Sequence, residues 1–519
     1  MHAFVVRPAA RDGGARAWSA ALAGTRLDPR EREERVETLL DGPDHRLARA
    51  GLALACAGTA PRVACRLASL GEAPEEPWFG TFELPRPPRF VWDLPRAQAV
   101  PLAETLEARA LEPLGELDTT RARWAVLDEE HKVVTWIEDE RQRLTPPAGE
   151  GPAREVHRLV VRGVRGYDAE CARVAALLEG AEGLARAGGA EPVPAEALLP
   201  LPRRRPGRWA PLAPGTRAFP ALARIVRAQL EVLRRNAPGL RAGADAEYLH
   251  DTRVALRRLR SLLGQLDGIL PEAEQAECVA ELRALARATG PARDADTLLF
   301  ELHMAPPELA ADLGPVLAAL AEERERMQAE LVAALEAPRA RRCLRGLRTA
   351  FAAGREQAAG PRAGTDFARV VAKRLRRRLR QVLARAAEVR STSPGPELHA
   401  LRIACKKLRY LLECCRGLVP AAELEACVGP LKGLQGVLGT IQDVEVHGEA
   451  LRALALGPAA GAGPAAHLAL GRFLEQGARR GRAARARYEQ LADALLAPPS
   501  RAAFEHLRAR LRPEPGTGA

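Results

Sequence analysis

The chain has 519 residues, of which 78 are Lys or Arg and 66 are Asp or Glu, which gives a formal charge of +12. This length suits two or three domains, and no run approaches the ~20 consecutive apolar residues of a membrane-spanning helix, which excludes a membrane-spanning protein. The start, MHAFVVR, lacks the apolar region of a signal peptide, and the nine Cys show no paired spacing and no CxxC. We therefore expect a protein of the reducing cytoplasm.

The charge is distributed unevenly along the chain. Residues 1–200 contain 26 basic and 32 acidic residues (26 − 32 = −6), and the rest contains 52 and 34 (52 − 34 = +18). All six Trp lie at or before residue 209. This pattern predicts two different domains, at 1–187 and 216–510, joined by a Pro/Arg-rich linker at 188–215 and followed by a disordered tail at 511–519.

The first domain is predicted to be a small α+β domain with an antiparallel sheet. β-branched and aromatic residues at strand length mark five segments, and 128–132 is a hairpin turn between the third and the fourth. Residues 168–187 have apolar residues at helical period and are expected to pack on the sheet as a helix. The predicted strands are 78–84, 89–94, 124–127, 133–137 and 156–161.

The second domain is predicted to be all-α. Long Leu/Ala/Arg/Glu stretches carry apolar residues at i, i+3, i+4 and i+7, which favours six to ten helices of roughly 15–25 residues packed as bundles. Pairs of Pro and Gly are expected to break the helices at 238–239, 290–291, 306–307, 360–361, 429–430 and 498–499.

A block of sixteen residues occurs twice in the helical part, at an offset of 149. YLHDTRVALRRLRSLL (248–263) aligns with ELHALRIACKKLRYLL (397–412), and ten of the sixteen positions keep their identity or charge. The same offset carries Leu282, Leu285, Gly290 and Asp294 onto Leu431, Leu434, Gly439 and Asp443 without an insertion. We infer two similar helical bundles, at about 216–360 and 361–510, related by a pseudo-twofold axis.

The repeated blocks carry cations along one helix face. At 100° per residue, the first His and the three Arg or Lys at i+3, i+7 and i+10 fall within an arc of 80°. We identify two such stripes, a third basic helix and two preceding Arg. They are His250, Arg253, Arg257 and Arg260; His399, Arg402, Lys406 and Arg409; Lys373, Arg376 and Arg380; and Arg224 and Arg227.

A run of charge on a helix is usually a solvated face that pairs with Glu at i±4. Between 248 and 263 the only carboxylate is Asp251, and between 369 and 380 there is none. Neighbouring like charges repel, so their retention in both repeats favours an anionic partner over a solvated face.

The linear arrangement of Arg and Lys in the stripes indicates which kind of anion they bind. Arg forks and Lys point charges in linear arrays suit a long polyanion better than one small phosphate. Nucleic acid would require aromatic side chains for stacking, and only Tyr248 and Tyr410 lie near the stripes. This favours inorganic polyphosphate, with nonspecific RNA binding left open.

Other candidate residues have several interpretations. His250 and His399 could be core residues, metal ligands or phosphate contacts, and their duplication beside Arg favours phosphate. Asp294 and Asp443 are interpreted as structural partners of Arg or as helix caps, and Cys414-Cys415 as core residues. We expect no metal, no cofactor and no catalytic residue.

The duplicated blocks, followed by LARATGPARDADTLL and LKGLQGVLGTIQDVEV, resemble the conserved histidine α-helical domain (CHAD) over about 216–510. That resemblance implies two four-helix bundles around a basic surface that binds inorganic polyphosphate, in some members on polyphosphate granules. Its implied contacts are the two stripes and the third basic helix. The full set of predicted binding residues adds Arg258, Lys407, Arg377 and Lys432 to the stripes, the third helix, Arg224 and Arg227.

The first domain resembles a CYTH domain, the triphosphate tunnel barrel that often precedes CHAD. Residues 40–54 are similar to one of its strand pairs and 123–139 to its central hairpin. The family's opening ExExK is replaced by Phe4-Val5-Val6-Arg7-Pro8, its R-x-R by Ala55 and Ala57, and its later acidic strand by RLVVR (158–162). Because carboxylates hold the Mg²⁺ of such an enzyme, we predict a degenerate, non-catalytic domain; the alternatives are a CYTH-type triphosphatase and an RNA-binding scaffold.

Overall fold

The computed structural model describes residues 2–6, 14–69, 80–147, 151–181, 184–186, 211–352 and 360–511. The chain divides into two compact units, Met1–Arg205 and Pro206–Ala519. Residues 188–210 of the predicted linker, the start of the first predicted strand (78–79) and the tail beyond residue 511 lie outside the described residues.

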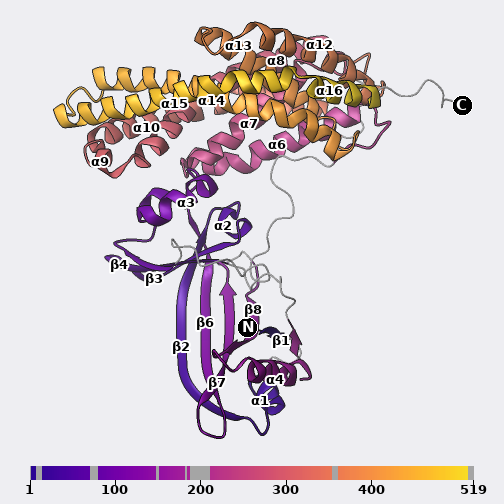
Figure 1. Ribbon diagram of the computed structural model, residues 1–519. Coiled ribbons are helices and arrows are strands. Elements are labelled where there is room, and N and C mark those ends of the chain that lie inside the picture. The colour runs from indigo at the N-terminus through magenta and orange to yellow at the C-terminus, as the bar shows by residue number, and fades with distance from the viewer. Residues whose placement is uncertain are drawn as a thin grey trace, which may run out of the picture. The chain divides into compact units, whose positions relative to one another are not determined.

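Unit 1 is built on a nine-stranded antiparallel sheet in the order β5-β4-β3-β2-β6-β7-β8-β1-β9. Figure 1 shows β2, β6 and β7 as long neighbouring strands. The strands are β1 (His2–Val6), β2 (Arg26–Asp41), β3 (Leu52–Thr59), β4 (Arg62–Ser69), β5 (Gly80–Leu84), β6 (Glu112–Leu127), β7 (Val133–Thr145), β8 (Arg154–Gly163) and β9 (Leu184–Arg186). The helices are α1 (Gly14–Ala21), α2 (Arg46–Arg49), α3 (Arg96–Leu106) and α4 (Asp168–Glu179).

The antiparallel sheet and the 128–132 hairpin turn were predicted correctly, since Asp128 N–H donates to the carbonyl of Lys132. Two local predictions were wrong. Residues 89–94 form a 3₁₀ turn (Val91–Asp93) instead of a strand, because the Asp93 carboxylate accepts from two backbone N–H groups before it. The predicted helix at 168–187 ends at Glu179, and the chain after it supplies β9 at the sheet edge.

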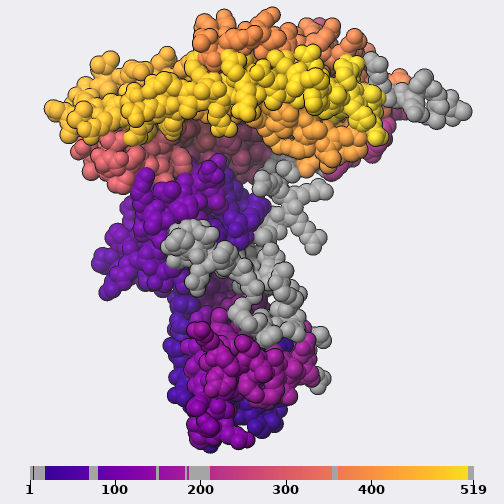
Figure 2. Space-filling view, in the orientation of Figure 1, coloured from indigo at the N-terminus to yellow at the C-terminus, as the bar shows by residue number. Residues whose placement is uncertain are grey.

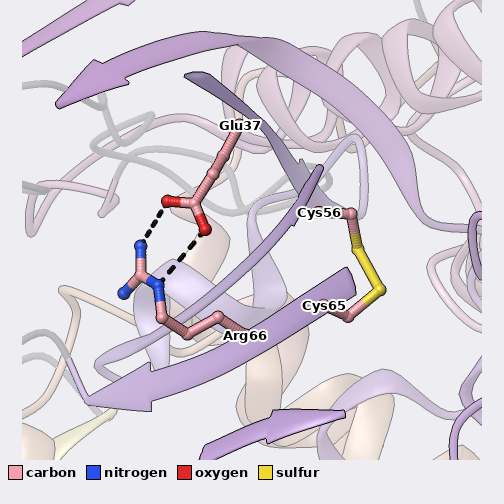
Figure 3. The surroundings of a disulfide bond; sticks show 4 residues. All are labelled: Glu37, Cys56, Cys65 and Arg66. Carbon is pink, nitrogen blue, oxygen red and sulfur yellow. Dashed lines mark hydrogen bonds and ion pairs between the residues drawn. A yellow bond between two sulfur atoms is a disulfide. The ribbon is translucent and has the colours of Figure 1, made fainter. Parts of the chain in front are cut away.

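Cys56 and Cys65 form a disulfide between β3 and β4, where they face each other in register. Figure 3 shows this bond beside the ion pair between Arg66 and Glu37. The bond was not predicted from the sequence, because the two cysteines are 9 residues apart and meet only through the pairing of β3 with β4. A disulfide is unusual in the reducing compartment that the sequence analysis expected.

Unit 2 is all helical, and its helices form two repeats. The first contains α6 (Ala218–Ala242), α7 (Ala246–Leu263), α8 (Glu272–His303), α9 (Pro307–Ala310), α10 (Gly314–Glu336) and α11 (Pro338–Ala350). The second contains α12 (Phe367–Glu388), α13 (Gly395–Glu413), α14 (Ala421–Leu456), α15 (Pro464–Leu496) and α16 (Pro498–Arg510). Within the described residues, each repeat has four long helices and a shorter final one, and the first repeat also contains the four-residue α9. Figure 2 shows α15 and α16, in yellow, covering one face of this unit.

The duplication is confirmed by where the helices begin. α12, α13 and α14 each start 149 residues after α6, α7 and α8 (367 − 218, 395 − 246 and 421 − 272). Arg217 also pairs with Asp366, its own equivalent, in an antiparallel bridge, as expected beside a twofold axis. The repeats share one hydrophobic core, which contains buried residues of α6, α7 and α8 together with residues of α12, α13 and α14. They are therefore two halves of one folded unit.

Three of the six predicted helix breaks were wrong. α6, α8 and α14 continue through Pro238, Pro291 and Pro430, and α8, α14 and α15 have 32, 36 and 33 residues, longer than expected. An interior proline costs ~3 kcal/mol. α8 can bear this cost because both of its halves are buried, with Leu282 in the shared core and Leu302 in a second apolar cluster. None of the described helices combines the length and the apolar character needed to cross a bilayer.

Candidate polyanion-binding surface

The structure brings the two predicted stripes together across the pseudo-twofold axis. α7 carries the first stripe, and its start is fixed by Asp245, whose carboxylate accepts from Glu247 N–H and Tyr248 N–H. α13 carries the second stripe and packs against α7. We call the residues that meet there the central cluster: Arg253, Arg257, Arg402 and Lys406.

The central cluster is electrostatically unfavourable in the free protein. Burial, followed by the charges of Arg402 and Arg257, lowers the pKa of Lys406 to about 7. Burial, followed by Arg257, lowers the pKa of Arg253. Burial and Arg257 also lower the pKa of Arg402, against the opposite effect of Asp443. An anion bound here would relieve this repulsion.

Two donors of the cluster have no partner. The Nε atoms of Arg257 and Arg402 are buried and make no hydrogen bond within the parts of the chain that the structure describes. Arg253 is better satisfied, since its Nη1 donates to Thr289 Oγ1 at 3.2 Å and to the carbonyl of Ala286 at 3.4 Å. Buried donors are normally paired in proteins, so these nitrogen atoms indicate a missing acceptor.

On one side the cluster continues into what we call the first flank, which is formed by α7, α8, α12 and α13. Arg260 is close enough to Arg283 and Arg287 for their charges to lower its pKa, after the larger effect of burial. Burial, followed by Arg378 and Arg260, lowers the pKa of Lys407. The first flank consists of Arg260, Arg283, Arg287, Arg378 and Lys407.

The pseudo-equivalent positions, which we call the second flank, are largely neutralised. Arg258 and Arg409 both pair with Glu413, at 3.4 and 3.5 Å, and Lys432 pairs with Glu425 at 2.9 Å. Their equivalents in the first flank (Lys407, Arg260 and Arg283) form no ion pair among the described residues, because Gly264 and Ala276 stand where Glu413 and Glu425 would be. The two halves of the surface therefore differ in net charge.

Other predicted residues lie away from the cluster. Three predicted residues of α12, Lys373, Arg376 and Arg380, are exposed. Measured around the helix axis from Arg374, they lie at 200–260°. Arg378 lies at 40° on the other side of the helix, where it faces Lys407. Arg377, at 300°, adjoins Arg374 and Arg378. Arg224 donates to the carbonyl of Pro211, and Arg227 to that of Ala223 in its own helix.

Three cations of the first flank were not predicted from the sequence, namely Arg283, Arg287 and Arg378. A fourth, Arg385, has a charge that also lowers the pKa of Lys407. A signal for one of them existed, because Arg283 lies 149 residues before Lys432, which had been predicted (432 − 283). The correct face of α12 could not be found from charge alone, since Arg or Lys occurs on nearly every side of that helix.

The two histidines are in different surroundings. His399 Nδ1 hydrogen bonds to Gln442 Oε1, which makes that nitrogen the donor. The equivalent of Gln442 is Arg293 (442 − 149), so His250 does not share this arrangement. Asp443 forms the predicted pair with an Arg, at 3.9 Å from Arg402 Nη2. Cys414 and Cys415 are fully buried, which raises the pKa of both thiols, as expected of core residues.

Unit 1 has buried carboxylates at positions that the CYTH motifs did not predict. Glu140 is 4% exposed and pairs with Arg121 and Arg158, whose charges lower its pKa despite the opposing effect of burial. Glu37, also 4% exposed, forms ion pairs with Arg35 and Arg66. In the described residues, no group of three or more His, Cys, Asp or Glu is placed to hold a metal ion.

The comparison with protein families decides what unit 2 is: the model of the CHAD domain matches residues 224–452. The chain carries a CHAD domain. The match includes both sixteen-residue blocks, the central cluster and both flanks, but it is narrower than the range of 216–510 expected for CHAD. The antiparallel sheet of unit 1 is consistent with a CYTH-like domain.

Two solved structures are similar to the chain. The CHAD domain from the plant Ricinus communis has 28% sequence identity and a TM-score of 0.48, and the match covers 56% of this chain and 96% of that one. PptA from Streptomyces chartreusis has 21% identity and a TM-score of 0.41, with 53% and 99% covered. A comparison with curated proteins finds no match.

Proposed function

We propose that the protein binds inorganic polyphosphate through the central cluster and the first flank of its CHAD domain, without catalysing a reaction. The observation that carries this proposal is the convergence of cations from four helices, two of which (α7 and α13) contribute buried Nε donors that lack acceptors, those of Arg257 and Arg402. A chain of phosphates offers a negative charge and several acceptor oxygens at each unit, which matches such an array of Arg and Lys. The CHAD resemblance implies the same ligand.

The aromatic residues near the surface favour polyphosphate over nucleic acid. Tyr410 is only 5% exposed. The ring of Tyr248 packs so closely on Gly239 that a Cβ there would lie 2.5 Å from it. The buried ring of Tyr410 offers no face on which a base could stack, and the ring of Tyr248 is packed against α6, whereas single-strand binding proteins use aromatic stacking on open rings.

A competition experiment tests the ligand. With labelled long-chain polyphosphate bound to the full-length protein, unlabelled polyphosphate should displace the label at least tenfold more effectively than RNA at equal phosphate concentration. Affinity should fall steeply with salt, because bound counterions are released. Equal or better displacement by RNA would replace this proposal with RNA binding.

The difference between the flanks gives a second prediction. Replacing Glu413 and Glu425 by Gln releases Arg258, Arg409 and Lys432 from their ion pairs and should extend the cationic surface. Because exposed pairs contribute roughly 0–1 kcal/mol each, we expect polyphosphate to bind about threefold to tenfold more tightly at low salt.

The matched control is Glu475→Gln on α15, which frees Arg479 and Arg482 outside the surface and should change the affinity less than twofold. Calorimetric titration of the three proteins measures the effect. If the control raises the affinity as much as the double variant, the gain comes from net charge and not from the second flank.

The proposed polyphosphate binding also predicts that the protein accompanies polyphosphate in the cytoplasm, including polyphosphate granules.

A further inference from the structure

The first repeat contains a cavity of about 430 Å³ beside α7, and none of the central-cluster residues lines it. It lies among α6, α7, α10 and α11, and its walls are mostly aliphatic. They include Leu233, Ala237, Thr252, Leu256, Leu335 and Leu344. This volume falls within the range of roughly 300–1000 Å³ that is typical of small-molecule sites.

The equivalent region of the second repeat is filled by side chains, and the two regions can be aligned. α10 and α15 end at Glu336 and Leu496, an offset of 160 (496 − 336). The offset is supported by an equivalent contact, since Gln328 Nε2 donates to the carbonyl of Leu240 and Tyr488 hydroxyl to that of Val389 (488 − 328 = 160; 389 − 240 = 149). The last helices of the two repeats can therefore be compared residue by residue.

Two residue differences at equivalent positions of the repeats explain why the cavity is present in the first repeat. Thr252 corresponds to Leu401 (401 − 252 = 149), and Leu344 to Phe504 (504 − 344 = 160). Leu401 and Phe504 are fully buried, as is Leu495, whereas Leu344 and the equivalent of Leu495, Leu335, are partly exposed. Smaller side chains in the first repeat leave unfilled a space that the second repeat fills.

Polar groups mark the floor and the rim of the cavity. Thr252 is 3% exposed, and its Oγ1 has no hydrogen-bond partner within the described residues. At the rim, Arg241 and Arg341 both pair with Glu336. Arg345 and Arg348 are exposed on α11 and form no ion pair with any described residue. An apolar cavity beneath two unpaired guanidinium groups fits a ligand with a hydrocarbon tail and an anionic head.

We propose that this cavity binds a single-chain anionic amphiphile of the fatty-acid type, with the hydrocarbon chain against the leucines and the headgroup at Arg345 and Arg348. The site is separate from the polyphosphate surface, and the two can be occupied independently.

Calorimetric titration of the full-length protein with monomeric octanoate, decanoate and dodecanoate tests this proposal. Binding should be saturable, with one ligand per chain, and its affinity should rise about fourfold per added methylene. The variant Thr252→Leu/Leu344→Phe, which copies the residues of the second repeat, should lose at least tenfold in dodecanoate affinity while its polyphosphate affinity stays unchanged. Leu344→Phe alone provides the same test if the double variant does not keep the melting temperature and helicity of the wild type.

The headgroup is tested separately. Arg345→Glu, which copies Glu505 of the second repeat (505 − 345 = 160), should weaken dodecanoate at least fivefold and leave dodecanol unaffected. Arg501→Glu on α16 is the control and should change neither. The proposal is wrong if dodecanoate does not bind to the wild type, or if folded cavity variants bind it as tightly. Equal loss of both ligands in Arg345→Glu would overturn the assignment of the headgroup.

Discussion

Replacing Arg257, Arg402 and Lys406 together by Gln is expected to weaken polyphosphate binding at least 100-fold. These side chains supply two buried Nε donors without partners and a partly buried ammonium group. A hydrogen bond to a charged group contributes about 1.5–3 kcal/mol, and each 1.4 kcal/mol corresponds to a factor of ten in affinity. Three such contacts therefore account for a 100-fold loss even if they are only partly additive.

The same variant should unfold at a higher temperature than the wild type. Burial and mutual repulsion lower the pKa of Lys406 and Arg402, which means that the folded protein bears a cost for keeping them charged. Removing the charges removes this cost. A variant that loses binding and gains stability would show that the cluster is kept for its ligand and not for the fold.

The matched control removes three charges from another part of the same unit. Lys373, Arg376 and Arg380 are exposed on the far side of α12, and replacing them by Gln should reduce affinity less than threefold. Fluorescence anisotropy with labelled polyphosphate compares the variants, and circular dichroism records their melting. An equal loss in both variants would mean that overall charge, and not the central cluster, binds the anion.

The duplication explains why so much of unit 2 could be predicted from its sequence. An offset of 149 without insertions requires equivalent helices to start at equivalent residues, and α6, α7 and α8 do so with α12, α13 and α14. The periodicity then placed Arg253 and Arg257 on one face, and the pseudo-twofold axis brought that face to its counterpart on α13.

What could not be predicted depends on packing between distant segments. Pro291 was read as a helix end because local propensity disfavours proline, but burial on both sides of it keeps α8 intact. The face of α12 that reaches Lys407 is set by how α12 packs on α13. In unit 1, Glu37 meets Arg66 only because β2, β3 and β4 are neighbours in the sheet.

Polyphosphate affinity is also expected to fall by roughly tenfold between pH 7 and pH 8.5, because of Lys406. Its pKa in the free protein is about 7, well below the ordinary 10.5. Below pH 7 the side chain is charged before and after binding. Above pH 7 the free protein has lost this proton, and a bound polyanion, which restores a higher pKa, must recover it. Affinity can then decrease by up to about tenfold per pH unit.

The variant Lys406→Arg isolates this effect, because a guanidinium stays protonated over the whole range. It should bind polyphosphate with nearly the same affinity at pH 7 and pH 8.5. Calorimetry in buffers of different ionisation enthalpy should detect proton uptake at pH 8 in the wild type and not in the variant. The groups that face Lys406 are Arg402 and Arg409 on its own helix, Arg257 on α7 and Asp443 on α14. If Lys406→Arg keeps the full pH dependence, the titrating group is not Lys406, and the affinity of the cluster does not depend on the charge of this residue.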